Sequence, residues 1–303
     1  MKTPHKEVEE KFSVPLFLFT MAWSLAVIAG TYWFFAAWLP VHFGYKPTYW
    51  EIQFNAAGWR YGLVFTAFQG CDCFAEWLFH RYVLHAPLIP GFQSLFYKHD
   101  RRHHMLTHIT ILDSGPGGKT WRSAFAILKQ SQFETSYFPW YTMLGFAVTI
   151  SIVAVPLQLL LPNWPIFGCA IVSVAWSLTV YEIVHMIQHW PAPFWKTLIT
   201  LVGRPAEVAF SYHAEHHAHM HATNENISGI CGFPVADIVM GTLKIPQSLQ
   251  FTGEKVILGD EILPVPRFAL IRWLDSKAAA ARERYENDKI AKRRKSDSLP
   301  MAA

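Results

Sequence analysis

The residues of this sequence that can do chemistry are its histidines, which are concentrated in a few short segments. There are 15 histidines, and all except His5 and His42 fall into four groups. Neutral imidazole is a ligand for iron, zinc, copper and nickel, so this grouping indicates metal binding. The groups are His80 and His85; His99, His103, His104 and His108; His185 and His189; and His213, His216, His217, His219 and His221.

The spacing inside the groups fits ligands that lie on helices. Residues three or four apart share a helix face, so His185 and His189 can bind one ion together. Adjacent histidines point about 100° apart on a helix, so the two members of a doublet can face two different ions. His80 and His85 are five residues apart, which predicts that the helix ends or bulges there. Shared faces are also expected for His99 with His103, and for His213 with His216 or His217.

The histidine pattern occurs twice along the chain. In each half a pair is followed by a group that contains a doublet, and the two pairs begin about 105 residues apart. Ten imidazoles are too many for one ion and suit two. His108 and His221 each follow the second histidine of a doublet by four residues, and are expected as ligands, as partners of ligands or as surface residues. The predicted ligands are His80, His85, His99, His103, His104, His185, His189, His213, His216 and His217.

Acidic residues near the histidines are candidates for orienting them, since a ligating histidine usually donates its other N–H to a carboxylate or a carbonyl. Asp72 and Glu76 precede His80 at intervals of four residues, so the three share a helix face. Glu182 lies three residues before His185. The remaining candidates are Glu207 and Glu215, which flank the last group and can equally be ordinary interfacial acids.

Composition indicates a membrane protein. Apolar residues make up 52% of the chain and charged residues 16%, against roughly a quarter charged in soluble proteins. The 13 tryptophans fit the aromatic belts at the two faces of a bilayer. The four cysteines show neither zinc-ribbon nor disulfide spacing. A net charge of +4 without a basic binding motif argues against a nucleic-acid partner.

The apolar segments predict an all-α integral membrane protein with about four transmembrane helices and a cytoplasmic helical cap that holds the dimetal site. The first loop between spans carries only Lys46 and Arg60 as basic residues, and the second turn carries none. The positive-inside rule therefore places both termini and every histidine group in the cytoplasm, at a bacterial inner membrane or the endoplasmic reticulum. The expected spans are about 14–39, 61–85, 138–161 and 166–189, within a domain 14–275 that is flanked by an N-terminal tail, 1–13, and a charged C-terminal tail, 276–303.

The four histidine groups follow predicted membrane hairpins, two groups after each hairpin. In this arrangement and in their spacings they resemble the histidine groups of the fatty acid hydroxylase/sterol desaturase superfamily. The resemblance covers roughly residues 60 to 245. A stretch after the last group is also similar, although two residues stand where the family usually has one aromatic residue before glycine. This stretch contains Asn226, the inserted Ile227 and Ser228, Gly229, and the run from Asp237 to Gly241 and Thr242.

The resemblance implies a non-haem di-iron centre that uses O2 to oxidise a C–H bond of a lipid. The ligands alone do not select iron, and zinc can be the metal found after purification. Hydroxylation is the first expectation, because the spacings look closest to the hydroxylase branch. Desaturation, ether-lipid cleavage and aldehyde formation remain open on the same site.

Turnover would require two electrons from outside. The chain lacks the haem motif of a fused cytochrome b5 domain, so we expect a separate donor, a ferredoxin or a cytochrome b5. The alternative of another class is a histidine-rich metal transporter, whose ligands would be expected near the bilayer midplane instead of at helix ends. A histidine-lined haem protein is a third reading.

Overall fold

The structure is a computed structural model that describes residues 14–34, 38, 41–42, 49, 51–113, 119–139, 141–230, 232–245, 256–257 and 262–297. The expected N-terminal tail, 1–13, lies outside these residues. The chain divides into two compact units, and the described residues are mostly helical, as the composition predicts. The bundle unit comprises Met1–Phe74, Leu128–Ile187 and Ser228–Phe233; the histidine unit comprises Ala75–Ile127, Gln188–Ile227 and Pro234–Ala303.

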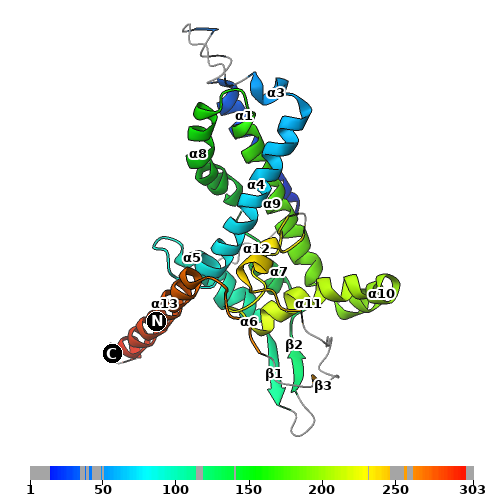
Figure 1. Cartoon of the computed structure of the whole chain (residues 1–303). Helices are drawn as coiled ribbons and strands as arrows, with labels where there is room; N and C mark the ends of the chain where they lie inside the picture. Colours follow the sequence, from blue (N-terminus) through cyan, green and yellow to red (C-terminus); the bar gives the residue numbers. More distant parts are fainter. Residues whose placement is uncertain are drawn as a thin grey trace. The chain divides into compact units, whose positions relative to one another are not determined.

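Helices make up the bundle unit (Figure 1). Met21, Ala147 and Leu178 pack together, so α1 lies against α8 and α9. Phe68 and Ala170 pack together where α4 meets α9, and the small alanine lets the two helices approach closely. The helices are α1 (Val14–Trp33), α3 (Ile52–Asn55), α4 (Gly58–Phe79), α7 (Gln130–Ser136), α8 (Thr142–Leu160) and α9 (Ile166–Gln188), of which α4 and α9 end in the histidine unit.

Two helices within the described residues, α8 and α9, are long and apolar enough to cross a membrane. They match the third and fourth expected spans, but the expected number of four is not reached. Helix α4, in the second expected span, is too polar to qualify because it carries Gln69, Asp72 and Glu76. In the first expected span, the apolar helix Met21–Gly30 lies within α1, and part of that span lies outside the described residues.

A buried glutamine pair holds α3 against the α8–α9 hairpin. Gln53 Nε2 donates to Gln158 Oε1, and Gln53 Oε1 accepts from the Gly168 amide, both at 2.8 Å. Gln158 Nε2 in turn donates to the Trp164 carbonyl at 2.9 Å. A side chain at position 168 would place its Cβ 3.1 Å from Gln53 Oε1, so glycine allows this close approach. Every amide group of the pair therefore has a partner inside an apolar unit, where an unpaired group would be costly.

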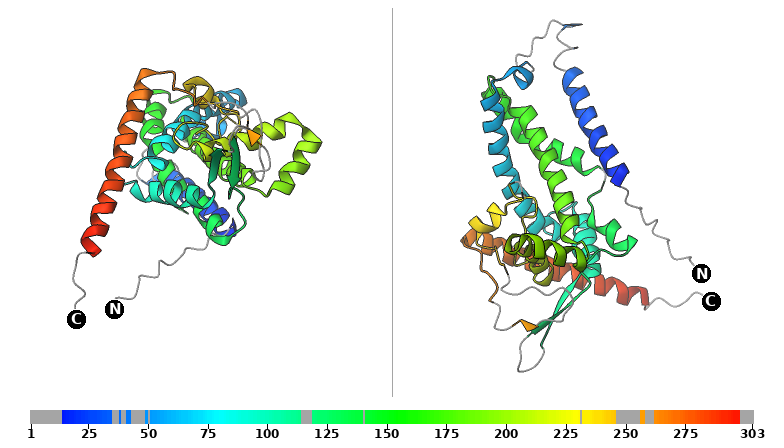
Figure 2. Two further views of the ribbon diagram at one scale, coloured as in Figure 1. Left: turned by 90° about the horizontal axis from the view of Figure 1, so that it is seen from below. Right: turned by 90° about the vertical axis from the view of Figure 1, so that its right-hand side faces the viewer.

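The histidine unit contains short helices and a three-stranded antiparallel sheet, so the all-α expectation is wrong in this respect (Figure 2). Strand pairing runs from Ile109 opposite Ser123 to Asp113 opposite Lys119. β-Branched residues are frequent in strands because they pack well on a pleated surface, and Ile109, Thr110 and Ile111 fit this preference. The strands are β1 (Ile109–Asp113), β2 (Lys119–Ser123) and β3 (Val256–Ile257), and the helices are η2 (His80–Leu84), α5 (Gln93–Phe96), η3 (Tyr97–His103), α6 (His104–Leu106), α10 (Ala192–Val202), α11 (Arg204–Ala218), α12 (Val235–Met240) and α13 (Ala269–Asp297).

Helix α13 is continuous across position 276, where the charged C-terminal tail was expected to begin (Figure 2). Asp275 accepts two hydrogen bonds from the Arg81 guanidinium, at 2.8 and 2.9 Å. About two turns further on, Arg282 donates to the carbonyl of His85 at 3.1 Å, and Ala281 is buried. The first turns of this helix therefore pack on the segment that carries the first histidine pair.

Replacing Gln53 by alanine is expected to lower the free energy of unfolding of the protein by about 1–3 kcal/mol, because it removes the hydrogen bond to Gln158 and leaves the Gly168 amide without its partner. Thermal unfolding in detergent measures this change. The matched control is Gln130→Ala, since the Gln130 side chain is exposed and bonds only Glu134 in an exposed position. Equal shifts for the two variants would contradict the role of the buried pair.

Candidate metal centre

His80 and His85 face the same side because the helix widens between them. The His85 amide donates to the His80 carbonyl at 3.0 Å, which is the five-residue hydrogen bond of a π-helix. On a regular α-helix residues five apart diverge, but the wider turn of η2 brings the two rings to 4.9 Å, nearly parallel. The bulge that the spacing predicts is confirmed.

The same five-residue hydrogen bond of a π-helix occurs at the end of η3. The His104 amide donates to the carbonyl of His99, again five residues earlier. His99 is therefore aligned with His104, and their Nε2 atoms are 3.1 Å apart. The prediction that His99 shares an ion with His103 is wrong, because it assumed α-helical geometry for a segment that is π-helical.

Helix α11 is regular, and its histidines divide between two directions. His213 and His217 are four residues apart on one face, with Nε2 atoms at 3.2 Å. His216, next to His217, points elsewhere, and its Nε2 lies 3.0 Å from Nε2 of His85. One doublet thus serves two sets of imidazoles, as the sequence predicts.

The imidazoles form two buried groups whose ligand nitrogens lie within 4.8 Å of one another, and each group can hold a metal ion. Two nitrogens bound at about 2.0–2.1 Å to one ion lie about 2.8–3.4 Å apart, which agrees with the 2.9 Å between His80 and His99 and the 3.2 Å between His213 and His217. Site A consists of His80, His85, His99, His104 and His216. Site B consists of His103, His189, His213 and His217, to which α9 adds His185, one turn before His189 on the same helix face.

The two sites are adjacent. The rings of His104, in site A, and His217, in site B, stack at a centroid distance of 4.1 Å. The ring of His103, in site B, lies 5.2 Å from the ring of His104, in site A. The doublets therefore connect the sites through single peptide bonds as well as through ring contacts.

In five of the ligand candidates the second ring nitrogen, Nδ1, faces an oxygen that can only accept. A histidine in that position is protonated on Nδ1, so the lone pair of its Nε2 points into the site. Four of these oxygens are backbone carbonyls and one is a carboxylate. The pairs are His80 with Glu225 O (2.6 Å), His216 with Thr223 O (2.8 Å), His189 with Phe125 O (2.7 Å), His217 with Thr107 O (2.9 Å) and His85 with Asp100 Oδ1 (2.9 Å).

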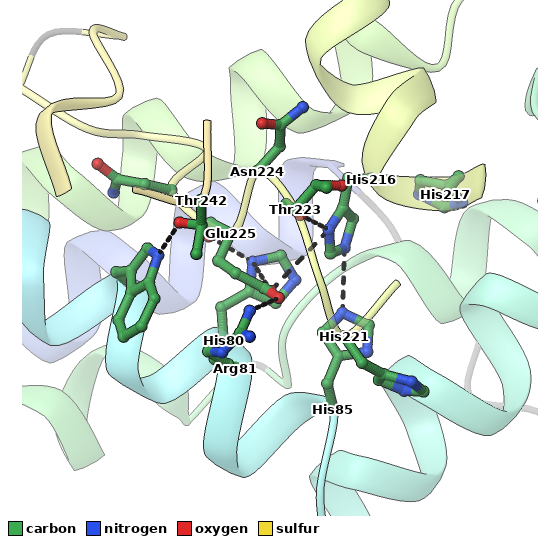
Figure 3. A network of polar contacts seen from close by, with 12 residues as sticks. His80, Arg81, His85, His216, His217, His221, Thr223, Asn224, Glu225 and Thr242 are labelled. Carbon is green, nitrogen blue, oxygen red and sulfur yellow. Dashed lines mark hydrogen bonds and ion pairs between the residues drawn. The ribbon is translucent and has the colours of Figure 1, made fainter. Parts of the chain in front are cut away.

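The pair of His85 and His216 indicates what these sites need. Both Nδ1 atoms are donors, so two Nε2 lone pairs face each other at 3.0 Å (Figure 3). Only a proton or a metal cation between them removes the repulsion. Burial, together with the neighbouring imidazole of His80, holds the pKa of His216 well below its ordinary value of 6.5, which disfavours the proton. A metal ion fits this arrangement.

A short loop supplies two of the acceptor carbonyls of site A, those of Thr223 and Glu225 (Figure 3). Asn224 between them has a φ of 55°, a left-handed conformation that asparagine tolerates better than most residues. Its side-chain amide donates to the carbonyls of Tyr212 and Lys244, both at 2.7 Å. The loop is therefore fixed on both sides of the carbonyls that accept from His216 and His80.

Asp237 fixes the same loop through the backbone amides of the loop. Its carboxylate accepts from the amides of Glu225 at 3.1 Å and Asn226 at 2.8 Å. It also accepts from Trp77 Nε1 at 3.0 Å and from the Tyr212 hydroxyl. The resemblance singles out Asn226 and Asp237. Both thus help to hold the loop whose carbonyls accept hydrogen bonds from the ligands His80 and His216.

Glu225 is a residue of the centre that the sequence analysis missed. Burial raises the pKa of its carboxyl to about 8, although Arg81 at 3.1 Å acts in the opposite direction. Its Oε2 lies 3.8 Å from Nδ1 of His80 and 3.9 Å from Nδ1 of His216 (Figure 3). An ionised carboxylate there would favour positive charge in site A. Its position in a polar run after the last histidine group was the only signal in the sequence.

Asp100 is the second residue that the sequence analysis missed, although it follows His99 directly. Its Oδ1 is shared by His85 Nδ1 at 2.9 Å and His221 Nε2 at 2.7 Å. His221 has a φ of 80° and lies outside sites A and B. Together with His85 and Asp100 it forms a third group whose ligand atoms lie close enough together to hold a metal ion. Of the three roles that the sequence left open for His221, those of a ligand and of a partner of a ligand both fit this position.

Two of the acidic candidates lie in the bundle unit. Asp72 accepts from the hydroxyls of Ser173 and Ser177, and so joins α4 to α9. Glu182 Oε1 accepts from the Phe138 amide at 2.8 Å. These bonds give both residues a role in helix packing.

Glu76 and His108 differ in how close they come to the centre. Glu76 Oε2 accepts from Asn226 Nδ2 at 2.8 Å, so it contacts the loop of site A. His108 is exposed, with Nδ1 3.1 Å from the Met105 carbonyl, and it belongs to neither site. It is therefore a surface residue.

The two acids that flank the last group also have partners outside the sites. Glu207 pairs with Arg204 at 2.8 Å, one turn away on α11. Glu215 is buried and pairs with Lys244 at 3.0 Å and with His219 at 2.8 Å. His219 is thereby placed beside α11 and outside both sites.

No family model matches this chain, and neither a curated protein nor a solved structure does. Membership of the fatty acid hydroxylase/sterol desaturase superfamily therefore stays a prediction from the histidine spacings. The function has to be argued from the geometry of the two sites.

His216→Ala is expected to lower the occupancy of site A, and His217→Ala that of site B, because each removes one converging imidazole. Metal content per chain, measured by mass spectrometry after dialysis, should fall from two towards one in each variant and towards zero in the double variant. His108→Ala is the control and should retain two ions. Equal loss in the control would contradict the assignment of ligands.

Asp237→Asn is expected to lower the occupancy of site A more than that of site B. The amide places an N–H against the backbone donors of the loop, so the carbonyls that orient His80 and His216 shift. The substitution is made in the His217→Ala variant, in which only site A is complete, and metal content per chain is measured. The control is the exposed Asp288→Asn. Unchanged occupancy of site A would show that the loop does not depend on this carboxylate.

Acid is expected to destabilise the metal-free protein. Burial and neighbouring imidazoles hold the pKa values of His104 and His216 well below 6.5 in the folded state, whereas the unfolded chain has ordinary values. As the pH falls through about 6.5, the unfolded chain therefore binds protons that the folded protein does not, and the free energy of unfolding decreases. Denaturant titrations at several pH values between about 8 and 5 measure this slope. Stability that rises on acidification would contradict it.

Proposed function

We propose that the protein is a membrane-bound di-iron oxidoreductase that hydroxylates a C–H bond of a lipid with O2. The observation that carries the proposal is the pair of Nε2 lone pairs of His85 and His216, which face each other at 3.0 Å with both Nδ1 positions committed. Buried groups of this kind, arranged as two adjacent sites, support a dinuclear centre over a single structural ion.

Iron is proposed from the resemblance of the histidine spacings, since imidazole ligands bind zinc and copper as well. When bound, iron would supply the redox chemistry that an unactivated C–H bond requires and that no side chain offers. The residues of this chain hold the ions, fix the tautomer of each ligand through backbone carbonyls, and keep bulk water away from the buried sites. Glu225 adds a carboxyl group next to site A that can balance the charge of an ion there.

The membrane part of the proposal is supported by α8 and α9, which are long and apolar enough to cross a bilayer. We include in it the cytoplasmic position of the histidine unit, which follows from the distribution of lysine and arginine. A lipid substrate would then reach the sites from the bilayer without crossing water. The electrons would come from a separate ferredoxin or cytochrome b5.

The test begins with metal analysis of protein purified anaerobically in mild detergent. We expect about two irons per chain, and incorporation of label from ¹⁸O-labelled O2 into a fatty-acyl phospholipid or a sterol when a reduced ferredoxin is supplied. The control is the double variant His216→Ala/His217→Ala, which should give no labelled product. An unsaturated product without label would instead support desaturation.

Two outcomes would overturn the proposal. One metal or none in well-folded protein would contradict the dinuclear centre. Two ions together with metal uptake into proteoliposomes, and no oxygen-dependent product, would favour the metal transporter.

A further inference from the structure

Helix α10 has an apolar side that is wider than the histidine unit covers. Trp195 on this side is buried and packs on Phe210 of α11, with ring centroids 5.2 Å apart. Val202 lies further along the same side and is 53% exposed, and Leu201, about 120° around the helix from Trp195 at the edge of the apolar surface, is 78% exposed. Figure 1 shows α10 projecting from the histidine unit beside α11. Apolar side chains are thus presented outward on one stripe of a helix.

The opposite side of α10 is polar, but its hydroxyl groups need few hydrogen bonds from water. Thr197 donates to the Pro193 carbonyl at 3.0 Å, and Thr200 donates to the Lys196 carbonyl at 2.8 Å, so both hydroxyl protons are used within the helix. Lys196 is exposed, and it is the single charged residue of the segment 190–203. A long lysine side chain can keep its ammonium group in water while its stem lies along an apolar surface.

The position of α10 in the chain indicates which surface it meets. Helix α9, one of the two helices able to cross a bilayer, ends at Gln188, and α10 begins at Ala192. Trp190, between them, is 43% exposed and packs edge-on against Phe194 at 4.5 Å. Tryptophan is enriched at the boundary between bilayer and water, where the end of a span lies.

We propose that α10 lies in the plane of the bilayer surface, with Leu201 and Val202 among the lipid acyl chains and Lys196 towards the headgroups. Amphipathic helices with large aromatic and aliphatic residues on one side and lysine on the other bind lipid in this way. The proposal rests on the membrane part of the proposed function. Because His189 of site B lies three residues before α10, a bound helix would hold site B next to the lipid.

The experiment places the photoreactive residue p-benzoyl-phenylalanine at Leu201 or, as matched control, at Thr200, in the full-length chain in vesicles of phosphatidylcholine and phosphatidylglycerol. The two positions are adjacent and exposed, but they lie on different sides of α10. After irradiation, mass spectrometry of the segment 190–203 quantifies lipid adducts. We expect several-fold more lipid adduct from position 201 than from position 200.

Equal and low yields of adduct at both positions would overturn the proposal, since they mean that α10 lies in water. Crosslinks between two chains at position 201 would also overturn it and make the apolar stripe a contact with a second copy. A chain that is removed from the vesicles by alkaline washing would refute the membrane part of the proposed function itself. Metal content, measured on the same samples, reports on folding and is independent of catalysis.

Discussion

The repulsion between inward-pointing imidazole lone pairs is the constraint that the histidine unit is built to sustain. His85 and His216 meet at 3.0 Å, and neither ring can turn its N–H inward without abandoning an acceptor on its other side. The surrounding backbone and side chains therefore hold the two rings in an arrangement that is unfavourable in the metal-free protein. Binding of a cation converts this unfavourable arrangement into ligand bonds, which links metal binding to the stability of the fold.

Several parts of the fold serve to hold these rings in place. Two π-helical turns align histidines that a regular helix would separate, and the loop around Asn224 presents two carbonyls to Nδ1 groups. Asp237 secures that loop through backbone amides, and α13 reaches the carbonyl of His85 through Arg282. These hydrogen bonds set the orientation of the ligand rings.

The sequence predicts the existence of the two sites better than their detailed composition. Adjacent histidines had to point in different directions, so the division of His216 from His217 follows from helix geometry alone. The pairing of His99 with His104 does not, because histidine spacing cannot tell a π-turn from an α-turn. Glu225 lies next to site A only because of the tertiary fold, and residue spacing does not predict such a contact.

Two features of the fold were also beyond pattern reading. The pairing of β1 with β2 depends on a short local preference that is hard to separate from loop in a histidine-rich segment. Helix α4 is long enough to span a bilayer, but Asp72 and Gln69 are used for bonds with serines of α9, so its polarity reflects helix pairing. Residue counts cannot distinguish these uses of a polar group in an apolar segment.

The π-turns have a consequence for how such a centre can change over time. A π-turn is an α-turn that holds one additional residue, and it confines the disturbance to itself. His80 and His85, five apart on η2, therefore present the same face as two histidines four apart on an ordinary helix. Insertion or deletion of one residue between such ligands, compensated by a change of helix type, leaves the metal-facing surface and all later residues in register. What is preserved through such changes is the direction of each ring, while the interval in the sequence is free to drift.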